Sequence, residues 1–378
     1  MDHRTSKTFN ARYSTRRLNP IPIHLQTTTP RLQLLSPFYS GILPAEIRTL
    51  IFSYALTPTP VPDTNYDPNT HYTRPGFTCR TKLHVALLRT CRRIYLETYH
   101  LPPTSIPHVF WHERYPPGNK PSRAEHPYFL RLPDFQLALV NSIHLHTQLF
   151  WLEDSLTTLT PKPFLQNITT LKITIRRGDW WWNEQNEPLA INPYRGNAHV
   201  HQMHLDMEAS RRGDVPTWAL GKWGCAFAKT AKLEVLELEF ETSEEKREEL
   251  QSIVEWARTW EFPMGERGVL STRKNTNARA GENLKRAELG DVKMWEWRGQ
   301  RCHWSDICPY CVNDTCSLTE PAEGKNGDKC RERKDLLRRG EGPMLVVMEV
   351  KWKLRGHPKR EDVGVIEAEG DWGFEDQD

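Results

Sequence analysis

The chain of 378 residues has the length of one large domain or two ordinary ones. Only 38% of its residues are hydrophobic and its mean hydropathy is −0.67, which predicts that part of the chain lies outside a packed core. No apolar stretch approaches the ~20 residues of a membrane span, and no basic segment followed by an apolar one opens the sequence. These features exclude a membrane protein, a secreted disulfide scaffold and a fibrous protein, and we expect the cytoplasm or the nucleus.

The two ends of the chain carry charge blocks of opposite sign. Residues 1–40 contain six Lys and Arg against one Asp, and residues 361–378 contain eight Asp and Glu with no Lys or Arg. Blocks of one sign repel themselves and resist burial, so we predict a disordered basic arm at 1–36 and an acidic tail at 357–378. A nucleic-acid-binding arm is the alternative at the N-terminus. Few aromatic residues there could stack on bases, and nucleic acid is not the expected partner.

The first helix is expected at residues 42–56. Pro44 fits its first turn, where a missing N–H costs nothing. The apolar side chains recur at the i, i+3, i+4 and i+7 spacing of one helix face, and they are Ile47, Leu50, Ile51 and Tyr54. A Pro-, Thr- and Asn-rich loop is expected at 57–81. A second helix from about Lys82 to Tyr99 and a short strand at 109–111 follow.

From about residue 128 the pattern predicts short strands with one shared template, apolar-x-x-apolar-x-apolar. Copies begin at Val140, Ile168 and Leu233, and a fourth strand is expected at 345–354. The first two copies begin 28 residues apart, as in a leucine-rich-type repeat of ~20–29 residues, and the third requires an insertion. Strands that alternate with helices favour a small, mostly parallel sheet.

Two helices are expected beside these strands. One follows Thr242, which forms a capping box with Glu245, and the other spans about 217–229. The fold class is therefore α+β, with a helical module followed by an irregular, degenerate leucine-rich-repeat-like α/β layer of three or four strands. The expected boundaries are a basic arm at 1–36, a helical module at 37–112, the α/β layer at 128–262 and a charged and partly disordered insertion at 271–343. The final strand of the α/β layer is expected at 344–356, and the acidic tail at 357–378.

Two segments of the helical module carry a family resemblance. Residues 43–56 read Leu-Pro-x-Glu-Ile-x-x-Leu-Ile-Phe-x-Tyr-x-Leu, and residues 87–98 read Leu-Leu-Arg-Thr-Cys-Arg-Arg-Ile-Tyr-Leu-Glu-Thr. Together they resemble the F-box-like proteins of filamentous ascomycete fungi. The resemblance implies a non-catalytic protein that docks on the Skp-type adaptor of an SCF ubiquitin ligase and presents an unknown protein substrate. The docking residues that it implies are Leu43, Pro44, Ile47, Leu50, Ile51 and Phe52.

The same apolar helix face has a second interpretation. Such a stripe packs on its own protein more often than on a partner, here on the second helix of the module. The long loop between the two helices favours a related alternative, a protein-interaction scaffold without ligase association. We keep both interpretations beside the adaptor hypothesis.

A tryptophan-rich loop is the expected substrate side. Three consecutive indoles at 180–182 cannot all face one core, and loops that follow strands of α/β layers are common binding places. The candidate residues are Trp180, Trp181, Trp182 and Tyr194. The alternative is that this loop covers one end of the sheet.

Two groups of residues have metal-binding side chains. Cys302, Cys308, Cys311 and Cys316, with His303 and Cys330 nearby, could form a zinc-thiolate site, which with the basic arm gives a second alternative function, a zinc-binding nucleic-acid-associated protein. Their spacing matches no common zinc finger. Free thiols are therefore the alternative interpretation, and no metal or cofactor is assigned. A second group contains His199, His201, His204 and Asp206. On a helix, residues 199 and 201 point apart, which favours solvated imidazoles.

Sequence motifs for catalysis do not occur. The chain contains no phosphate-binding loop, no dinucleotide-binding glycine motif, no nucleophile elbow and no metalloprotease His-Glu-x-x-His. We therefore expect no catalytic residues and no enzymatic activity.

Overall fold

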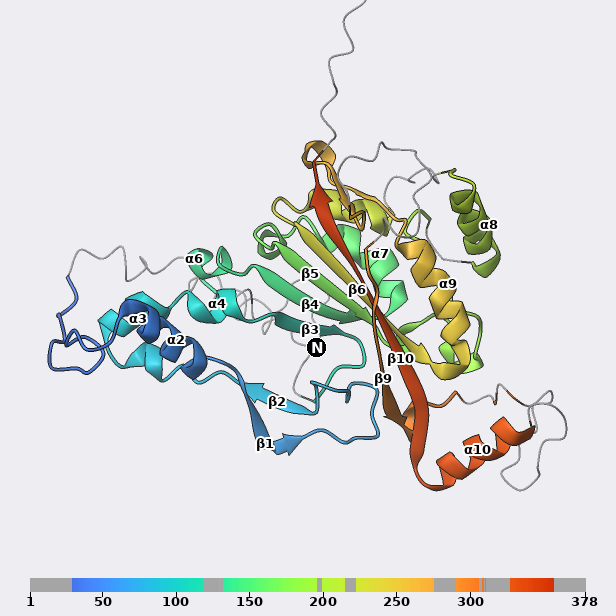
Figure 1. Ribbon diagram of the computed structural model, residues 1–378, viewed down its shortest axis with the longest axis horizontal. Helices are drawn as coiled ribbons and strands as arrows, with labels where there is room; N and C mark the ends of the chain where they lie inside the picture. The colour runs from blue at the N-terminus through green and yellow to red at the C-terminus, as the bar shows by residue number, and fades with distance from the viewer. Residues whose placement is uncertain are drawn as a thin grey trace, which may run out of the picture.

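The computed structural model describes residues 29–117, 129, 132–195, 199–214, 222–274, 290–305, 308, 310 and 327–356. The acidic tail, most of the basic arm, Cys311, Cys316 and much of 271–343 lie outside the described residues. Within them the fold is α+β, as predicted, with a mixed sheet and a lobe of short helices at one end of it (Figure 1). No helix there combines the length and apolar character that crossing a membrane requires.

The helical lobe contains α2 (Ala45–Ala55), α3 (Arg92–Thr98), α4 (Leu101–Ser105) and α6 (Asp134–Leu137). The first predicted helix is confirmed. The second is wrong in its length, because residues 87–89 form a separate 3-10 turn and α3 begins only at Arg92. Cys91 is extended at the N-cap, and its Sγ accepts the Ile94 N–H at 3.5 Å. A residue that caps a helix cannot lie inside it.

The core of this lobe joins α2 to α3 and α4. Phe52 and Leu56 lie on the inner side of α2, where they are buried with Ile94 and Leu101. Arg48 Nη2 lies 3.4 Å from Glu97 Oε1 and adds an ion pair between α2 and α3. The lobe therefore has a small apolar core of its own.

A β-hairpin replaces part of the loop that was expected at 57–81. Strands β1 (Thr59–Asn65) and β2 (Cys79–Lys82) pair antiparallel. Residues 66–78 connect the two strands and extend across the main sheet. The loop prediction was wrong because Pro and Thr on a two-stranded edge are compatible with a strand.

Over the described residues, the main sheet has eight strands rather than three or four. Four parallel strands begin it, β3 (His108–His112), β4 (Ser142–Thr147), β5 (Thr170–Ile175) and β6 (Val235–Ser243). Next to β6 the order continues antiparallel with β10 (Glu341–Arg355), β8 (Val269–Ser271) and β7 (Phe262–Pro263). The four predicted strands are confirmed as β4, β5, β6 and β10. The strand predicted at 109–111 pairs with β4, so it belongs to the sheet and not to the helical module.

Part of the predicted insertion at 271–343 is regular structure. Strand β9 (Lys293–Gln300) pairs antiparallel with β10, and the 3-10 helix η10 (Arg301–His303) and α10 (Gly327–Arg338) follow it. In Figure 1, α10 lies beside the start of β10, where Glu341 pairs with Gln300 at the end of β9. The final strand and the described part of the insertion therefore form one unit.

Helices α7 (Leu149–Leu159) and α9 (Arg247–Ala257) cover the apolar face of the sheet, and α8 (Val200–Arg211) lies beyond α9 (Figure 1). The capping-box prediction was wrong, because Thr242 is buried in β6 and α9 begins after a 3-10 turn at Glu244–Lys246. In the region predicted as a helix at 217–229, the described residues form the 3-10 helix η6 (Trp223–Lys229). Further 3-10 turns are Pro163–Leu165, Arg177–Asp179, Asn183–Gln185 and Gly265–Arg267.

Candidate functional site

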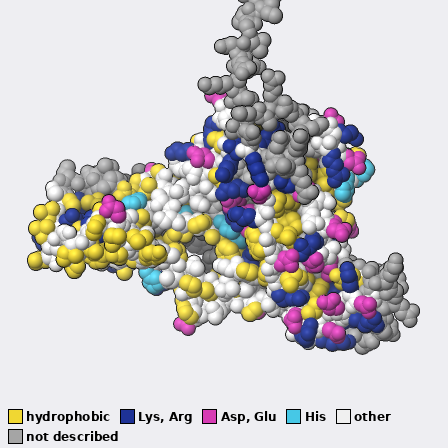
Figure 2. Space-filling view, viewed as in Figure 1, with side chains coloured by type: hydrophobic (Ala, Val, Ile, Leu, Met, Phe, Trp, Pro, Cys, Tyr) yellow, Lys and Arg dark blue, Asp and Glu magenta, His cyan; other side chains and the backbone are white. Residues whose placement is uncertain are grey.

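The apolar stripe of α2 faces outward. Phe52 and Leu56 fill the lobe core, so the opposite side of this helix meets solvent. The exposed fractions of the side chains in the predicted stripe are 44% for Ile47, 51% for Leu50, 38% for Ile51 and 73% for Tyr54. We call these four residues the α2 outer face. An exposed group of large apolar side chains is typical of interaction surfaces, and Figure 2 shows hydrophobic side chains gathered over this lobe.

The other predicted docking residues differ in exposure. Pro44 is exposed at the start of α2, and Leu43 is half-buried. The Leu43 carbonyl oxygen accepts a hydrogen bond from Arg48 Nη1 at 2.9 Å. Phe52 is buried in the lobe core, and this position is a correction to the expected docking set. The resemblance implied Phe52 as a docking residue, whereas its place on the helix turns it inward.

The tryptophan loop is divided in the same way. Trp180 is buried and its Nε1 donates to the Glu241 carbonyl oxygen at 2.9 Å, and Tyr194 is also buried. Neither is available to a partner, which corrects the expectation for both. Trp181 is half-buried, and Trp182 is 63% exposed on a left-handed backbone with φ of 53°. Left-handed backbone is unfavourable for a bulky residue and often marks a functional position.

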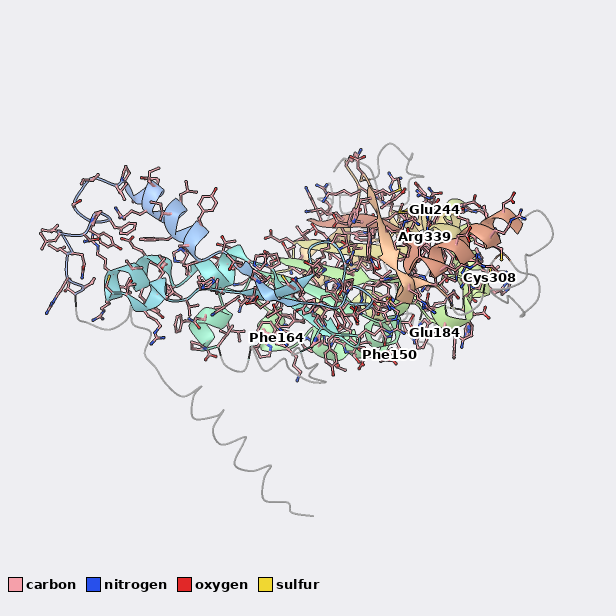
Figure 3. All side chains as sticks on the ribbon, turned by 90° about the horizontal axis from the view of Figure 1, so that it is seen from below. Phe150, Phe164, Glu184, Glu244, Cys308 and Arg339 are labelled. Carbon is pink, nitrogen blue, oxygen red and sulfur yellow. The ribbon has the colours of Figure 1, made fainter. Side chains whose placement is uncertain are left out.

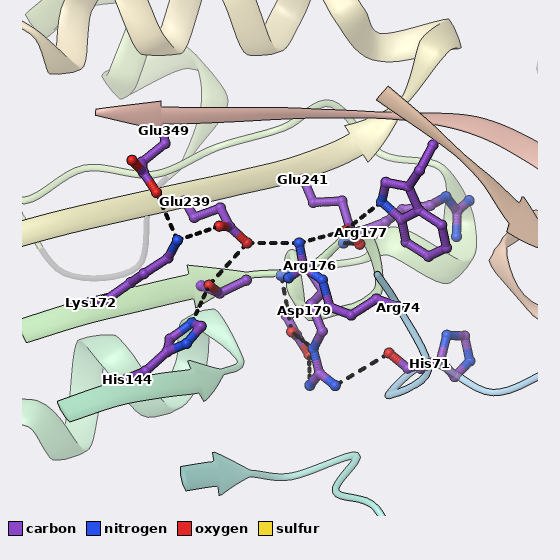
Figure 4. Close-up of polar contacts among 12 residues, drawn as sticks. His71, Arg74, His144, Lys172, Arg176, Arg177, Asp179, Glu239, Glu241 and Glu349 are labelled. Carbon is purple, nitrogen blue, oxygen red and sulfur yellow. Dashed lines mark hydrogen bonds and ion pairs between the residues drawn. The ribbon is translucent and has the colours of Figure 1, made fainter. Parts of the chain in front are cut away.

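The second face of the main sheet is polar. Side chains alternate between the two faces of a strand, and those that alternate with the core residues of β4, β5, β6 and β10 are His144, His146, Lys172, Thr174, Glu237, Glu239, Glu241, Glu349 and Lys351. Residues 66–78 cover part of this face. Figure 4 shows Arg74 of that segment pointing between two glutamates of β6.

Five charged residues form what we call the charged cluster. Arg74 Nη2 lies 2.7 Å from Glu239 Oε1 and 3.2 Å from Glu241 Oε2. Lys172 Nζ lies 2.7 Å from Glu239 Oε2 and 2.7 Å from Glu349 Oε2. All three carboxylates are buried. Buried charges need such paired partners, because an unpaired one would be strongly destabilising.

The ion pairs control the protonation of the cluster. Burial alone would raise the pKa of Glu239, but Arg74 and Lys172 lower it below its usual value. Burial would likewise raise the pKa of Glu349, and Lys172 and Lys293 lower it. Glu239 and Glu349 are therefore ionised at neutral pH, and the ion pairs of Arg74 hold residues 66–78 on the sheet.

A second fixed point lies beside the cluster. Arg176 Nε donates to Asp179 Oδ2 at 2.5 Å, and both residues are buried. Arg176 Nη1 donates to the backbone carbonyl oxygens of His71 at 3.3 Å and Arg114 at 3.0 Å. The segment that contains Arg74 is thus also attached through its backbone.

Buried histidines on the polar face predict a stability that depends on pH. Burial lowers the pKa of His144 to about 3 from 6.5, with Lys172 acting in the same direction, and burial also lowers the pKa of His146 well below 6.5. The unfolded chain therefore binds more protons than the folded chain below pH 6.5. We expect the free energy of unfolding to fall by about 1.4 kcal/mol per pH unit for each such histidine from there toward pH ~4.

Urea denaturation at a series of pH values measures this slope. His144→Gln should reduce the slope, since Gln does not titrate. His204→Gln, at an exposed position of α8, is the matched control and should leave it unchanged. An equal slope in His144→Gln and the unsubstituted chain would contradict the assignment.

The predicted cysteine cluster is separated by the fold. Cys308 Sγ lies 3.9 Å from Cys330 Sγ, and both are buried. Cys302 lies instead beside His303, with its Sγ 3.4 Å from Nδ1 of that ring, and close to His71. Burial raises the pKa of the Cys302 thiol to about 11 and lowers those of His71 and His303 to about 4. The described residues therefore do not bring Cys302 and Cys308 together as ligands of one zinc site.

The histidines of α8 are not assembled into a metal site. His201 and His204 are exposed on the helix. Asp206 is buried, and its carboxylate is already paired. Arg195 Nε lies 2.7 Å from Asp206 Oδ2, and the Asn192 side-chain amide donates to the same oxygen. The interpretation as solvated imidazoles agrees with this arrangement.

Comparisons with family models, with curated proteins and with solved structures find no match for this chain. The functional interpretation therefore depends on the surfaces described above. Sequence reasoning missed Arg74 and the polar face of the sheet. One available signal was the opposite charge of side chains at alternating positions on neighbouring strands, Lys172 against Glu239 and Glu349.

Proposed function

We propose that this chain is an F-box-like adaptor that binds a Skp-type subunit of an SCF ubiquitin ligase through the α2 outer face. One observation carries the proposal, the exposure of Ile47, Leu50, Ile51 and Tyr54 on a helix that begins with Leu-Pro. A buried stripe would have left no docking surface. Catalysis would belong to other subunits, and this chain would supply proximity.

The arrangement suits recognition of a helix in a groove. In that mode an amphipathic helix places apolar side chains at i, i+3, i+4 and i+7 into a partner groove, and Ile47, Leu50, Ile51 and Tyr54 have this spacing. The inner side of α2 is held by Phe52 and Leu56. The outer face can therefore be covered by a partner without any change in the lobe core.

Binding of the purified full chain to a recombinant Skp-type adaptor from a filamentous fungus tests this proposal directly. We expect a saturable complex in calorimetry and co-elution in size-exclusion chromatography. Failure to bind would leave the chain as a scaffold protein without ligase association.

The substrate side is proposed at Trp182, next to half-buried Trp181 and partly exposed Phe150. The ring centroids of Trp181 and Trp182 are 6.3 Å apart, as are those of Trp181 and Phe150. The Trp181 Nε1 donates to Glu153 Oε2 at 3.1 Å, which fixes this indole. Fixed aromatic side chains at a surface are common hot spots of protein interfaces.

Substitution of the exposed indole tests the substrate side. Trp182→Ala should change the free energy of unfolding by less than ~0.5 kcal/mol, because the side chain is largely solvated. It should lower the recovery of substrate proteins, but not of the adaptor, in affinity purification with quantitative mass spectrometry. Leu205→Ala, at an exposed position of α8, is the control. An unchanged set of captured proteins would contradict the assignment.

A further inference from the structure

Three potential metal ligands from distant parts of the sequence meet where residues 66–78 reach the end of β9. His71 comes from that segment, and Cys302 and His303 come from η10. Each side chain offers one ligand atom, and the three atoms all lie within 4.8 Å of one another. His303 is buried, and the other two are half-buried.

The spacing of these atoms is close to that of a tetrahedral zinc site. Zinc binds sulfur at about 2.3 Å and imidazole nitrogen at about 2.0–2.1 Å, so that a sulfur and a nitrogen ligand lie roughly 3.5 Å apart. Cys302 Sγ and His303 Nδ1 are 3.4 Å apart. The rings of His71 and His303 meet edge to face, with centroids 5.8 Å apart and planes at 75°.

Neighbouring groups orient the ligands. The Cys302 backbone N–H donates to Asn69 Oδ1 at 2.8 Å, which ties η10 to the segment that contains His71. His303 Nδ1 accepts the Gln300 backbone N–H at 3.0 Å, so this nitrogen is unprotonated and its lone pair points at that N–H. A metal ion at Nδ1 would replace that hydrogen bond.

The ligand atoms limit which ion fits, and the arginines nearby are partly neutralised by carboxylates. Arg176 and Arg177 lie near both imidazoles, and Arg114 lies near His71. Arg114 and Arg176 are paired with Glu184 and Asp179. One thiolate with two imidazoles is a ligand set that suits zinc, whereas Mg²⁺ and Ca²⁺ require oxygen ligands. A bound zinc ion deprotonates its thiol ligand outright.

We propose that His71, Cys302 and His303 bind a zinc ion, with a water molecule in the fourth position. The ion joins residues 66–78, which connect β1 to β2, to the end of β9 and so helps to hold them on the main sheet. This role is independent of the proposed adaptor function, since the α2 outer face does not include these residues.

Zinc titration of the full chain, reduced and freed of metal, tests the proposal. The probe is Zn²⁺ alone in competition with a chromogenic chelator. We expect His71→Ala to bind one equivalent less than the unsubstituted chain, and His204→Ala, at an exposed position, to bind the same number. The comparison is made at His71 because this residue is grouped with Cys302 and His303 and not with Cys308 and Cys330, whose own metal binding should be equal in all three proteins.

Two further measurements keep the test valid if His71→Ala folds poorly. With Co²⁺ in place of Zn²⁺, the unsubstituted chain should show a thiolate-to-cobalt charge-transfer band that weakens in Cys302→Ser. His71→Cys should retain the equivalent and increase that band, because it adds a second thiolate. Equal zinc binding by His71→Ala and the unsubstituted chain, or a cobalt spectrum that neither variant changes, would overturn the proposal.

Discussion

Replacement of two residues of the α2 outer face by aspartate, Ile47→Asp with Ile51→Asp, is expected to abolish adaptor binding. Each apolar side chain buried on binding contributes about 1.5–3 kcal/mol, so the double variant should bind at least ~100-fold more weakly. The loss should exceed this value if a carboxylate enters the apolar groove without a partner. Isothermal calorimetry with the purified adaptor measures the change in Kd.

Separate controls exclude a loss of folding and a general effect of an aspartate at an exposed apolar position. Both residues are exposed, so the free energy of unfolding of the double variant should change by less than ~1 kcal/mol. Met294→Asp, at an exposed apolar position of β9, is the matched control and should bind the adaptor normally. Phe52→Ala should instead lower stability by about 3–5 kcal/mol, because it empties the lobe core. Unaltered adaptor binding by the double variant would refute docking through this face.

The charged cluster predicts the second large effect. Arg74→Met should lower the free energy of unfolding by about 3–5 kcal/mol, since it removes the cation that faces two buried carboxylates. Lys172 continues to pair with Glu239 but is not an ion-pair partner of Glu241. Chemical denaturation measures the loss. Limited proteolysis should also cut residues 66–78 faster, because one of the attachments of this segment to the sheet is gone.

A surface ion pair on the same network is the matched control. Lys293 Nζ lies 2.7 Å from Glu349 Oε1, but the lysine side chain is 70% exposed. Lys293→Met should therefore cost no more than ~1 kcal/mol. Adding Glu241→Gln to Arg74→Met should recover part of the stability, because a neutral amide needs no counter-ion. Similar losses in Arg74→Met and Lys293→Met would show that burial does not strengthen the Arg74 pair.

The strands of the main sheet were predictable where local pattern and burial agree. The template residues Leu171, Ile173 and Ile175 of β5 are all buried on the face covered by α7 and α9, and alternation of this kind is visible in a single sequence. Strand β9 was placed in a charged insertion, although Trp295 and Trp297 alternate with charged residues there. Its partner β10 lies more than 40 residues further on, and a local pattern carries no information about such pairing.

The candidate sites show the same limit more strongly. Ile47 and Ile51 point outward because Phe52 and Leu56 pack against α3 and α4. Periodicity alone could not show this, since it marks both sides of α2 as apolar. Arg74 stands in a Pro-rich segment whose composition says nothing of a contact with Glu239. Cys302 was grouped with Cys308 by proximity in sequence, whereas the chain turns it toward His71.

The position of β10 in the sheet has a consequence for synthesis on the ribosome. This strand is the last regular element along the described chain, yet it pairs with β6, β8 and β9 at once. Until it emerges, one edge of β6 has no neighbour, and unpaired strand edges are prone to intermolecular association. Nascent chains that stall before Glu341 should therefore depend on chaperones, whereas a chain that extends past Arg355 contains every strand of the main sheet that the structure describes.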